Sequence, residues 1–302
     1  MPESTNDRAS LTSRTLPQMK LSDGSTSSMT GPPLPMPHYL TAEGRAIKRF
    51  AVEGNAILTG GAGTLALVNA RALLEHGLTG LGLFDLDHTH AGPDIQSLKQ
   101  DFPHAEIVLV QVDVTSATEL ERAVETAYNA LGSIDHLLCF AGVVGCTHAL
   151  DMTPTEWSRT LNINTTGAFF AAQAVARQMK DQETGGTILF TASISAHRTN
   201  FPQPQAAYNA SKAALISLKS SLAAEWAVHG IRVNSLSPGY MDTILNAGEG
   251  VGEARRVWAE RNPMGRMGMP EELTGVVVLL CSAAGSYITG ADFVVDGGQT
   301  CF

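Results

Sequence analysis

The feature that most constrains the fold is a regular alternation, from about residue 50 to the C-terminus, of short apolar runs with longer segments of helical periodicity. Runs such as NAILT and GTILFTAS are apolar throughout, as strands buried on both faces are. The segments between them repeat apolar residues with the period of an α-helix. The expected strands cover residues 55–59, 81–85, 106–114, 136–142, 186–193, 231–239 and 291–298. The expected helices cover residues 65–77, 117–131, 154–180 and 206–230, and a further helix begins at residue 270.

This alternation predicts a single α/β domain built on a parallel sheet. Strands that are joined by helices pair in parallel, because each helix returns the chain to the same end of the sheet. Right-handed crossovers then place helices on both faces. We therefore expect a doubly wound, Rossmann-type sheet of about seven strands within residues 38–302, with no internal repeat and no domain break.

The first 37 residues differ from the rest of the chain. They contain no aromatic residue and are rich in Ser, Thr and Pro. Such a segment cannot bury enough apolar surface to offset the entropy of ordering it, so residues 1–37 are predicted to form a disordered tail. Three basic residues in the tail leave a transit peptide as an alternative, which three acidic residues disfavour.

Composition excludes several classes of protein. A net charge of -9 disfavours nucleic acid and anionic membrane surfaces as partners. The longest apolar run is too short to cross a bilayer, and no hydrophobic N-terminal segment marks secretion. Unpaired, scattered cysteines favour a reducing compartment over a disulfide framework or a zinc site, so we expect a cytoplasmic protein without a metal ion. The cysteines are Cys139, Cys146, Cys281 and Cys301.

A glycine-rich stretch, TGGAGTLAL, follows the first expected strand and leads into the first expected helix. Gly60, Gly61 and Gly63 permit a tight turn there, and the backbone N–H groups at a helix N-terminus favour a pyrophosphate. The usual third and fourth glycines fall at Thr64 and Ala66. The stretch therefore indicates a dinucleotide-binding loop, with a plain strand-to-helix turn as the alternative.

Asp85 stands at the end of the second expected strand, about twenty residues after the glycine loop, as the dinucleotide fingerprint requires. A carboxylate there accepts hydrogen bonds from a ribose diol and repels a 2′-phosphate. No Lys or Arg lies in the loop to hold such a phosphate. Asp85 therefore predicts NAD rather than NADP. Asp87 is the alternative carboxylate, and a turn-capping role is the alternative function.

Tyr208 and Lys212 are four residues apart at the start of a long expected helix, so their side chains share a face. A nearby ammonium group lowers the pKa of a phenol, which suits the phenol to proton transfer. Ser193 ends the preceding strand and is placed to hold a substrate oxygen, with Ser195 as a rival. A solvated Tyr–Lys pair and ordinary turn chemistry at the serines are the alternatives.

Together these residues resemble the short-chain dehydrogenase/reductase family, from about residue 50 to residue 302. The resemblance rests on an ordered set of motifs: TGGAGTLA, DV at 113–114, the AG of CFAG, NTTG, YNASK, SPGYMDT, NPMGRMGMPEEL and ITGADFVVDGG. The chain departs from the family pattern at Thr64 and Ala66, and at Cys139 and Phe140, where the family usually has two asparagines. All four departures lie where adenine and phosphate would bind.

The resemblance implies a set of site residues. The implied catalytic residues are Asn164, Ser193, Tyr208 and Lys212. The implied contacts of the dinucleotide are Gly60, Gly61, Thr64, Leu65, Asp85, Asp113, Val114, Gly142, Tyr208, Lys212, Pro238, Gly239, Met241 and Thr243. The expected cofactor is NAD, with NADP as the alternative, and a homo-oligomer, either a dimer or a tetramer, is expected.

The resemblance also implies reversible hydride transfer. When an alcohol is oxidised, Tyr208 as phenolate removes the hydroxyl proton while the nicotinamide takes the hydride. Ser193 positions the oxygen. Lys212 lowers the pKa of Tyr208 and binds the nicotinamide ribose, and Asn164 holds a water that links Lys212 to solvent.

The substrate is expected to be a secondary alcohol or ketone. The segment FPQPQAAYNASKAA is similar to fungal sugar and polyol reductases of the family. The loop at 240–268 is expected to cover the substrate. Trp258, Val143, His197 and Tyr240 are expected either to line the pocket or to serve in packing. Two other functions remain open: an NADP-dependent carbonyl reductase of polyketide or fatty-acid type, and a catalytically silent nucleotide-binding scaffold.

Overall fold

The computed structural model describes residues 15–243, 246 and 248–302 and contains one seven-stranded sheet in the order β3-β2-β1-β4-β5-β6-β7. Every neighbouring pair of strands is parallel. The strands are β1 (Asn55–Thr59), β2 (Gly80–Asp85), β3 (Glu106–Gln111), β4 (His136–Cys139), β5 (Gly186–Thr191), β6 (Ile231–Pro238) and β7 (Asp292–Val295). The predicted doubly wound α/β fold is confirmed.

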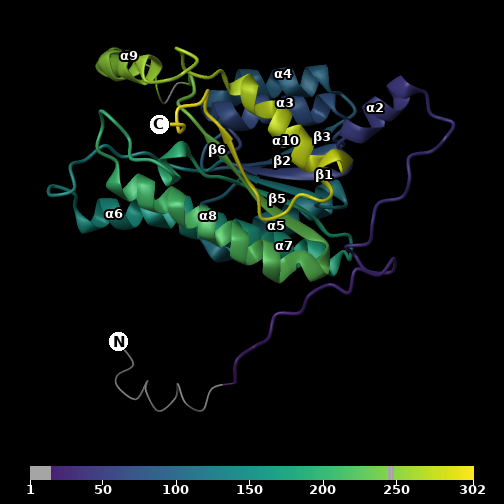
Figure 1. Cartoon of the computed structure of the whole chain (residues 1–302). Coiled ribbons are helices and arrows are strands. Elements are labelled where there is room, and N and C mark those ends of the chain that lie inside the picture. Colours follow the sequence, from purple (N-terminus) through teal and green to yellow (C-terminus); the bar gives the residue numbers. More distant parts are fainter. Residues whose placement is uncertain (1–14, 244–245, 247) are drawn as a thin grey trace.

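Helices cover both faces of this sheet (Figure 1). They are α2 (Ala42–Phe50), α3 (Thr64–Glu75), α4 (Gly92–Asp101), α5 (Ala117–Leu131), α6 (Pro154–Leu161), α7 (Ala168–Asp181), α8 (Ala206–Trp226), α9 (Gly252–Glu260) and α10 (Thr274–Cys281). One apolar cluster joins α3, α4 and α10 to the sheet, and a second joins α5, α7 and α8 to the opposite face. The core therefore has two layers separated by the sheet.

The strand order reverses between β1 and β4, which lie side by side at the centre of the sheet. In doubly wound sheets, ligands bind beyond the carboxyl ends of the strands at such a switch point. Thr59 at the end of β1 pairs with Cys139 at the end of β4. The glycine loop and the CFAG segment therefore begin next to each other.

Three helices were not predicted as helices from the sequence. No helix was expected over α2 or α4, and α9 falls within the loop expected at 240–268. Within α2 no residue is buried. Within α4 only Ile95 and Leu98 are buried, and within α9 only Trp258 is buried. Such thin apolar stripes give almost no periodic signal. Charged pairs between Arg256 and its neighbours Glu253 and Glu260 add support along α9.

Caps define the helices that carry the central part of the site. The hydroxyl of Thr153 accepts the N–H of Glu156, and Pro154 occupies the first position of α6, as the sequence predicted. The capping box is only half formed, because the Glu156 carboxylate instead accepts the hydroxyl of Thr147 at 2.5 Å. Glu156 thereby ties the loop after β4 to the start of α6.

The segment predicted to form a disordered tail is described only from residue 15. Residues 15–41 contain turns but neither a helix nor a strand, and most of their side chains are exposed. Met29 packs on Gly230: a Cβ added to this glycine would lie 3.0 Å from the Cβ of Met29. Among the described residues, no helix is long and apolar enough to span a bilayer.

We propose that residues 1–37 add little to the stability of the folded domain. Deleting them should change the melting temperature by less than about 2 °C and kcat/KM by less than about twofold, because few side chains of residues 15–37, the described part of the segment, are covered. Calorimetry and steady-state kinetics of the truncated chain check this. A fall of ten degrees or so would mean that the tail docks on the body and contributes to its folding.

Candidate active site

The four candidate catalytic residues converge at the carboxyl edge of the sheet. Ser193 follows β5 and begins the 3-10 turn η3 (Ile194–Ala196), where its hydroxyl accepts the N–H of Ser195 at 3.1 Å. Tyr208 and Lys212 lie on the first turns of α8. Asn164 lies in the π-helical segment η2 (Asn162–Gly167), between α6 and α7. Segments separated by tens of residues in the chain therefore supply one site.

Tyr208 and Lys212 share a helix face, as predicted. The Lys212 ammonium lies 5.6 Å from the centre of the Tyr208 ring and donates to the backbone carbonyl of Thr191 at 2.6 Å. Lys212 is buried, with 5% of its surface exposed, and burial lowers its pKa to about 8. The ammonium group of Lys212 is therefore held in place by α8 and by the end of β5.

The expected effect of Lys212 on Tyr208 is wrong for this state of the protein. Burial raises the pKa of the Tyr208 phenol, the neighbouring Ser193 hydroxyl opposes that rise, and the phenol of Tyr240 adds to it. The Lys212 ammonium points to the carbonyl of Thr191 rather than to the Tyr208 hydroxyl. Desolvation of the phenolate is therefore the largest influence on the pKa of Tyr208, and the phenol is neutral at neutral pH.

Asn164 forms hydrogen bonds to Val143, which lies in the segment that follows β4. Its side-chain oxygen accepts the N–H of Val143 at 2.8 Å, and its amide nitrogen donates to the carbonyl of Val143 at 2.9 Å and to the hydroxyl of Ser211 at 3.0 Å. A Cβ on Gly142 would lie 3.4 Å from Asn164 and 3.6 Å from the Lys212 ammonium. A π-helical turn in an α-helix frequently marks a functional position, and here it turns Asn164 toward Val143 and Ser211. A water-holding role for Asn164 stays a prediction.

Burial of Lys212 predicts a pH-dependent stability. Between its folded pKa of about 8 and its ordinary value of 10.5, the unfolded chain holds a proton that the folded chain has lost. The contribution of Lys212 to the free energy of unfolding is therefore least favourable below pH 8 and improves as the pH rises to 10.5. Without cofactor, the wild type should gain up to about 3 kcal/mol over this range relative to Lys212→Met, measured by urea unfolding. Parallel pH curves for the two proteins would contradict this.

The glycine loop has the local geometry of an anion site. Gly60 has a φ of +64°, and a Cβ on it would lie 2.7 Å from the backbone nitrogen of Ala141. A Cβ on Gly61 would lie 2.9 Å from the Cα of Leu83. Both positions require glycine. Gly63 is the N-cap of α3, and no side chain caps that helix end. The N–H groups of its first turn therefore remain for a phosphate.

The substituted glycines leave this loop intact. Thr64 and Leu65 occupy the first two positions of α3, next to the uncapped end. Ala66 is fully buried against the core cluster that joins α3 to the sheet. The extra methyl group thus fills a contact between helix and strand rather than closing the loop. Cys139 at the end of β4 is also buried, and burial raises the pKa of its thiol to about 12.

Asp85 faces the glycine loop, as a dinucleotide site requires. One of its carboxylate oxygens accepts the N–H of Ala62 at 3.0 Å and the other accepts the N–H of Leu86 at 2.7 Å. Asp85 also accepts the N–H of Asp87 at the longer distance of 3.5 Å. A carboxylate has about four acceptor positions, so at least one remains for a ribose hydroxyl group. The alternative, Asp87, instead accepts the backbone N–H of Thr89 at 2.8 Å. His88 is directed away from a phosphate, since its Nε2 lies 3.0 Å from the carbonyl of Leu83.

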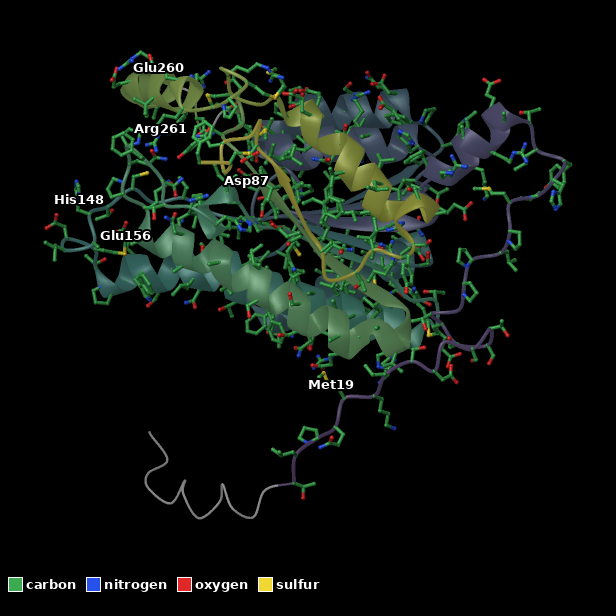
Figure 2. The ribbon with its side chains drawn as sticks, viewed as in Figure 1. Met19, Asp87, His148, Glu156, Glu260 and Arg261 are labelled. Carbon is green, nitrogen blue, oxygen red and sulfur yellow. The ribbon has the colours of Figure 1, made fainter. Side chains whose placement is uncertain are left out.

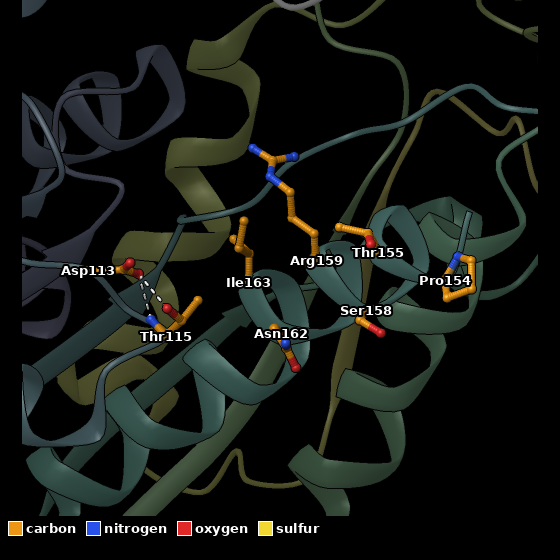
Figure 3. A pocket seen from close by; sticks show the side chains of 8 residues that line it. All are labelled: Asp113, Thr115, Pro154, Thr155, Ser158, Arg159, Asn162 and Ile163. Atoms are coloured by element: carbon orange, nitrogen blue, oxygen red, sulfur yellow. Dashed lines mark hydrogen bonds between the residues drawn. The ribbon is translucent and has the colours of Figure 1, made fainter. Parts of the chain in front are cut away.

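The expected adenine contacts lie along the loop between β3 and α5. Asp113 accepts both the N–H and the hydroxyl of Thr115 at 2.8 Å, and these two residues line a hollow of about 610 Å³ together with residues of α6 and η2 (Figure 3). Val114 packs on Gly167 of η2, where a Cβ would lie 2.8 Å from a Val114 methyl group. The adenine side of the candidate site is thus joined to the segment that carries Asn164.

The residues expected at the nicotinamide follow β6. Gly239 donates to the carbonyl of Val295 at 2.9 Å, and a Cβ on it would lie 2.8 Å from the Cα of Asp296. Pro238 ends β6 and pairs with Val295. Met241 is almost fully buried in the core, and Thr243 donates its N–H to the carbonyl of Met241 at 3.0 Å. This strand end is therefore held rigidly against β7.

The residues that were expected to line the substrate pocket lie only partly as the sequence predicted. Tyr240 and Trp258 stack with ring centres 4.2 Å apart, which places α9 over the loop that follows β6. His197 instead turns toward the sheet, where its Nε2 lies 2.9 Å from a carboxylate oxygen of Asp292. The sequence analysis did not single out Asn200 and Gln203, which both donate to the Tyr240 hydroxyl. Their only sequence signal is the amide-rich stretch before Tyr208.

Comparisons with known proteins agree with this geometry. A family model described as enoyl-(acyl carrier protein) reductase matches residues 60–300. The NADP-dependent mannitol dehydrogenase of Hypocrea jecorina is 33% identical over 88% of this chain and 99% of its own length. The galactitol 2-dehydrogenase of Rhizobium johnstonii is 36% identical over 84% of this chain and 98% of its own.

A solved structure agrees as well. The short-chain type dehydrogenase/reductase of Mycobacterium marinum superposes with a TM-score of 0.79 at 38% identity, over 85% of this chain and 99% of that one. The match to the family model, the shared fold and the near-complete coverage of these relatives lead to one conclusion. The chain belongs to the short-chain dehydrogenase/reductase family of enzymes, which act on CH–OH groups with NAD or NADP.

Proposed function

We propose that this enzyme interconverts a secondary alcohol group of a polyol and the corresponding ketone, with NAD(H) as the favoured cofactor. The observation that carries the proposal is the meeting of Ser193, Tyr208 and Lys212 at the carboxyl edge of the sheet, beside an uncapped helix end. The names of the mannitol and galactitol dehydrogenases to which the chain is similar support the substrate class.

The residues of the chain provide proton transfer and orientation. Tyr208 gives a proton to the ketone oxygen, or takes one from the alcohol in the reverse reaction, and Ser193 holds the same oxygen. The raised pKa of Tyr208 keeps its proton in place, so the phenol holds the proton that ketone reduction requires. In the oxidation of an alcohol a phenolate must form first, and for Lys212 to stabilise it the ammonium has to turn from the carbonyl of Thr191 toward the Tyr208 hydroxyl. A bound nicotinamide would supply or accept the hydride.

The preference for NAD(H) rests on Asp85. Its carboxylate is fixed by two backbone N–H groups next to the glycine loop, and no Lys or Arg lies within that loop. A 2′-phosphate placed there would meet a like charge. The relative from Hypocrea jecorina is named as NADP-dependent, which is the observation that favours the other cofactor.

A second candidate is a carbonyl reductase of fatty-acid or polyketide type. The description of the matching family model favours it. Two amide side chains, of Asn200 and Gln203, contact the Tyr240 hydroxyl, however, and such groups suit a hydroxylated substrate better than an acyl chain.

The test is a turnover assay of the purified full-length chain. Mannitol, arabinitol and galactitol should be offered with NAD or NADP, and sorbose and acetoacetyl thioesters with the reduced cofactors. The absorbance of the reduced nicotinamide is then followed. We expect turnover of at least one polyol or ketose. Turnover of the thioesters alone would establish the second candidate, and binding of a dinucleotide without any turnover would establish a silent scaffold.

A further inference from the structure

Tyr240 is held in a fixed position beside the candidate catalytic residues. β5 and β6 pair with Thr191 opposite Leu236, so Ser193 and Pro238 lie at the same level, and Tyr240 follows two residues later. Its ring stacks on Trp258 with an angle of 5° between the ring planes. The indole N–H of Trp258 donates to the side-chain oxygen of Gln203 at 3.0 Å. The phenol therefore has little freedom to move.

The hydroxyl of Tyr240 accepts two hydrogen bonds and retains its own hydrogen. Asn200 donates its amide to the Tyr240 oxygen at 2.9 Å, and Gln203 donates at 3.1 Å. These two bonds occupy both acceptor positions of a phenol oxygen. Among the described residues, no acceptor is paired with the Tyr240 O–H, and the side-chain oxygen of Asn200 is buried without a partner. Tyr240 and Asn200, as a pair, thus have one unused donor, the Tyr240 O–H, and one unused acceptor, the Asn200 side-chain oxygen.

Turning the Asn200 amide does not remove this surplus. With its two ends exchanged, Asn200 would accept from the Tyr240 O–H, and its amide nitrogen would become the unused donor. In either orientation one donor of the pair is left over. A buried polar group without a partner costs roughly 1–3 kcal/mol, so such a group commonly marks a place where a ligand or water completes the hydrogen bonds.

The chain brings this pair close to the reacting position. Asn200 and Gln203 belong to the loop that connects Ser193 to Tyr208, and the guanidinium of Arg261 lies 5.0 Å from the ring centre of Phe201 in that loop. Figure 2 shows Arg261, at the end of α9, on the same side of the molecule as His148 and Glu156 from the loop and helix that follow β4. The phenol of Tyr240 is also close enough to that of Tyr208 to raise its pKa, so a substrate oxygen held by Ser193 and Tyr208 would have Tyr240 as a neighbour.

We propose that Tyr240 and Asn200 bind a second hydroxyl group of the substrate, on the carbon next to the one that reacts. A hydroxyl group both donates and accepts, which matches the unused acceptor and donor of the pair. This inference rests on the proposed function and deepens it, since it selects vicinal diols and hydroxyketones over simple secondary alcohols and ketones. Burial also raises the pKa of Tyr240, so the phenol keeps its hydrogen at neutral pH.

The test compares 2,3-butanediol with 2-butanol, which differ by one hydroxyl group next to the reacting carbon. The wild type should have a kcat/KM at least about tenfold higher for the diol. Tyr240→Phe keeps the ring and its stacking on Trp258 and deletes only the hydroxyl. It should lower kcat/KM for the diol by about tenfold or more and leave that for 2-butanol within about twofold. Tyr287→Phe is the matched control, because Tyr287 is fully exposed at 102%.

Each other outcome counts against the inference. An equal loss for both alcohols would give Tyr240 a purely structural role, and no loss for either would mean that it does not contact the substrate. Equal or absent turnover of the two alcohols by the wild type would also overturn it. If that same protein oxidises polyols in the turnover assay, the proposed function stands and only the role of Tyr240 is rejected.

Discussion

Replacing Tyr208 with phenylalanine should lower kcat by at least about a hundredfold while leaving dinucleotide binding nearly unchanged. The variant keeps the aromatic ring beside Lys212 and deletes only the hydroxyl that carries the proton. The glycine loop and Asp85 belong to other elements and are not affected. Steady-state kinetics with the best polyol, together with a fluorescence titration of the dinucleotide, measure both quantities.

The control for this variant is again Tyr287→Phe, on the exposed surface. It should retain full activity. If Tyr208→Phe kept more than a few per cent of the wild-type rate, another group would have to transfer the proton. Loss of activity accompanied by loss of dinucleotide binding would instead point to a distorted site.

The second large effect concerns the choice of cofactor. The wild type should prefer NAD(H) to NADP(H) by about a hundredfold in kcat/KM, because a 2′-phosphate beside Asp85 sets like charges against each other. The double variant Asp85→Ser, Gly63→Arg should reverse this preference. Gly63 has a φ of -78°, which any residue adopts. A Cβ there would lie 3.1 Å from the carbonyl oxygen of Gly60, so the loop must shift by a few tenths of an ångström to take an arginine.

Asp87→Ser is the matched control for the cofactor experiment. The Asp87 carboxylate is exposed and is held by Thr89 rather than by the glycine loop. Its loss should leave the ratio of the two cofactors unchanged. Comparable kcat/KM values for NAD and NADP in the wild type would mean that Asp85 does not read the ribose.

Features that depend on local sequence were predicted well. β1 and β5 are almost entirely buried and α5 has a side-chain cap at Ser116, so these three elements lie where the sequence places them. The spacing of Tyr208 and Lys212 determined their shared face in the same way. Local patterns suffice for such features because each depends on residues at most four positions apart.

The substrate side could not be predicted in this way. Tyr240 receives hydrogen bonds from residues 37 and 40 positions earlier in the chain, and its stacking partner lies in a helix with a single buried residue. No periodicity records such contacts. The direction of the pKa shift of Tyr208 could not be predicted from the sequence either. It depends on how deeply the fold buries the phenol and on where the ammonium of Lys212 points.

Transfer of deuterium tests the central claim most directly. The wild-type enzyme should be incubated with oxidised cofactor and a polyol that carries deuterium on each secondary carbon, and the reduced nicotinamide should be analysed by mass spectrometry. Hydride transfer predicts one deuterium atom in each reduced cofactor formed by the wild type, and almost no reduced cofactor with Tyr208→Phe. Reduced cofactor that carries no deuterium would contradict the account. Failure to form any reduced cofactor, by a protein that binds the dinucleotide, would contradict it as well.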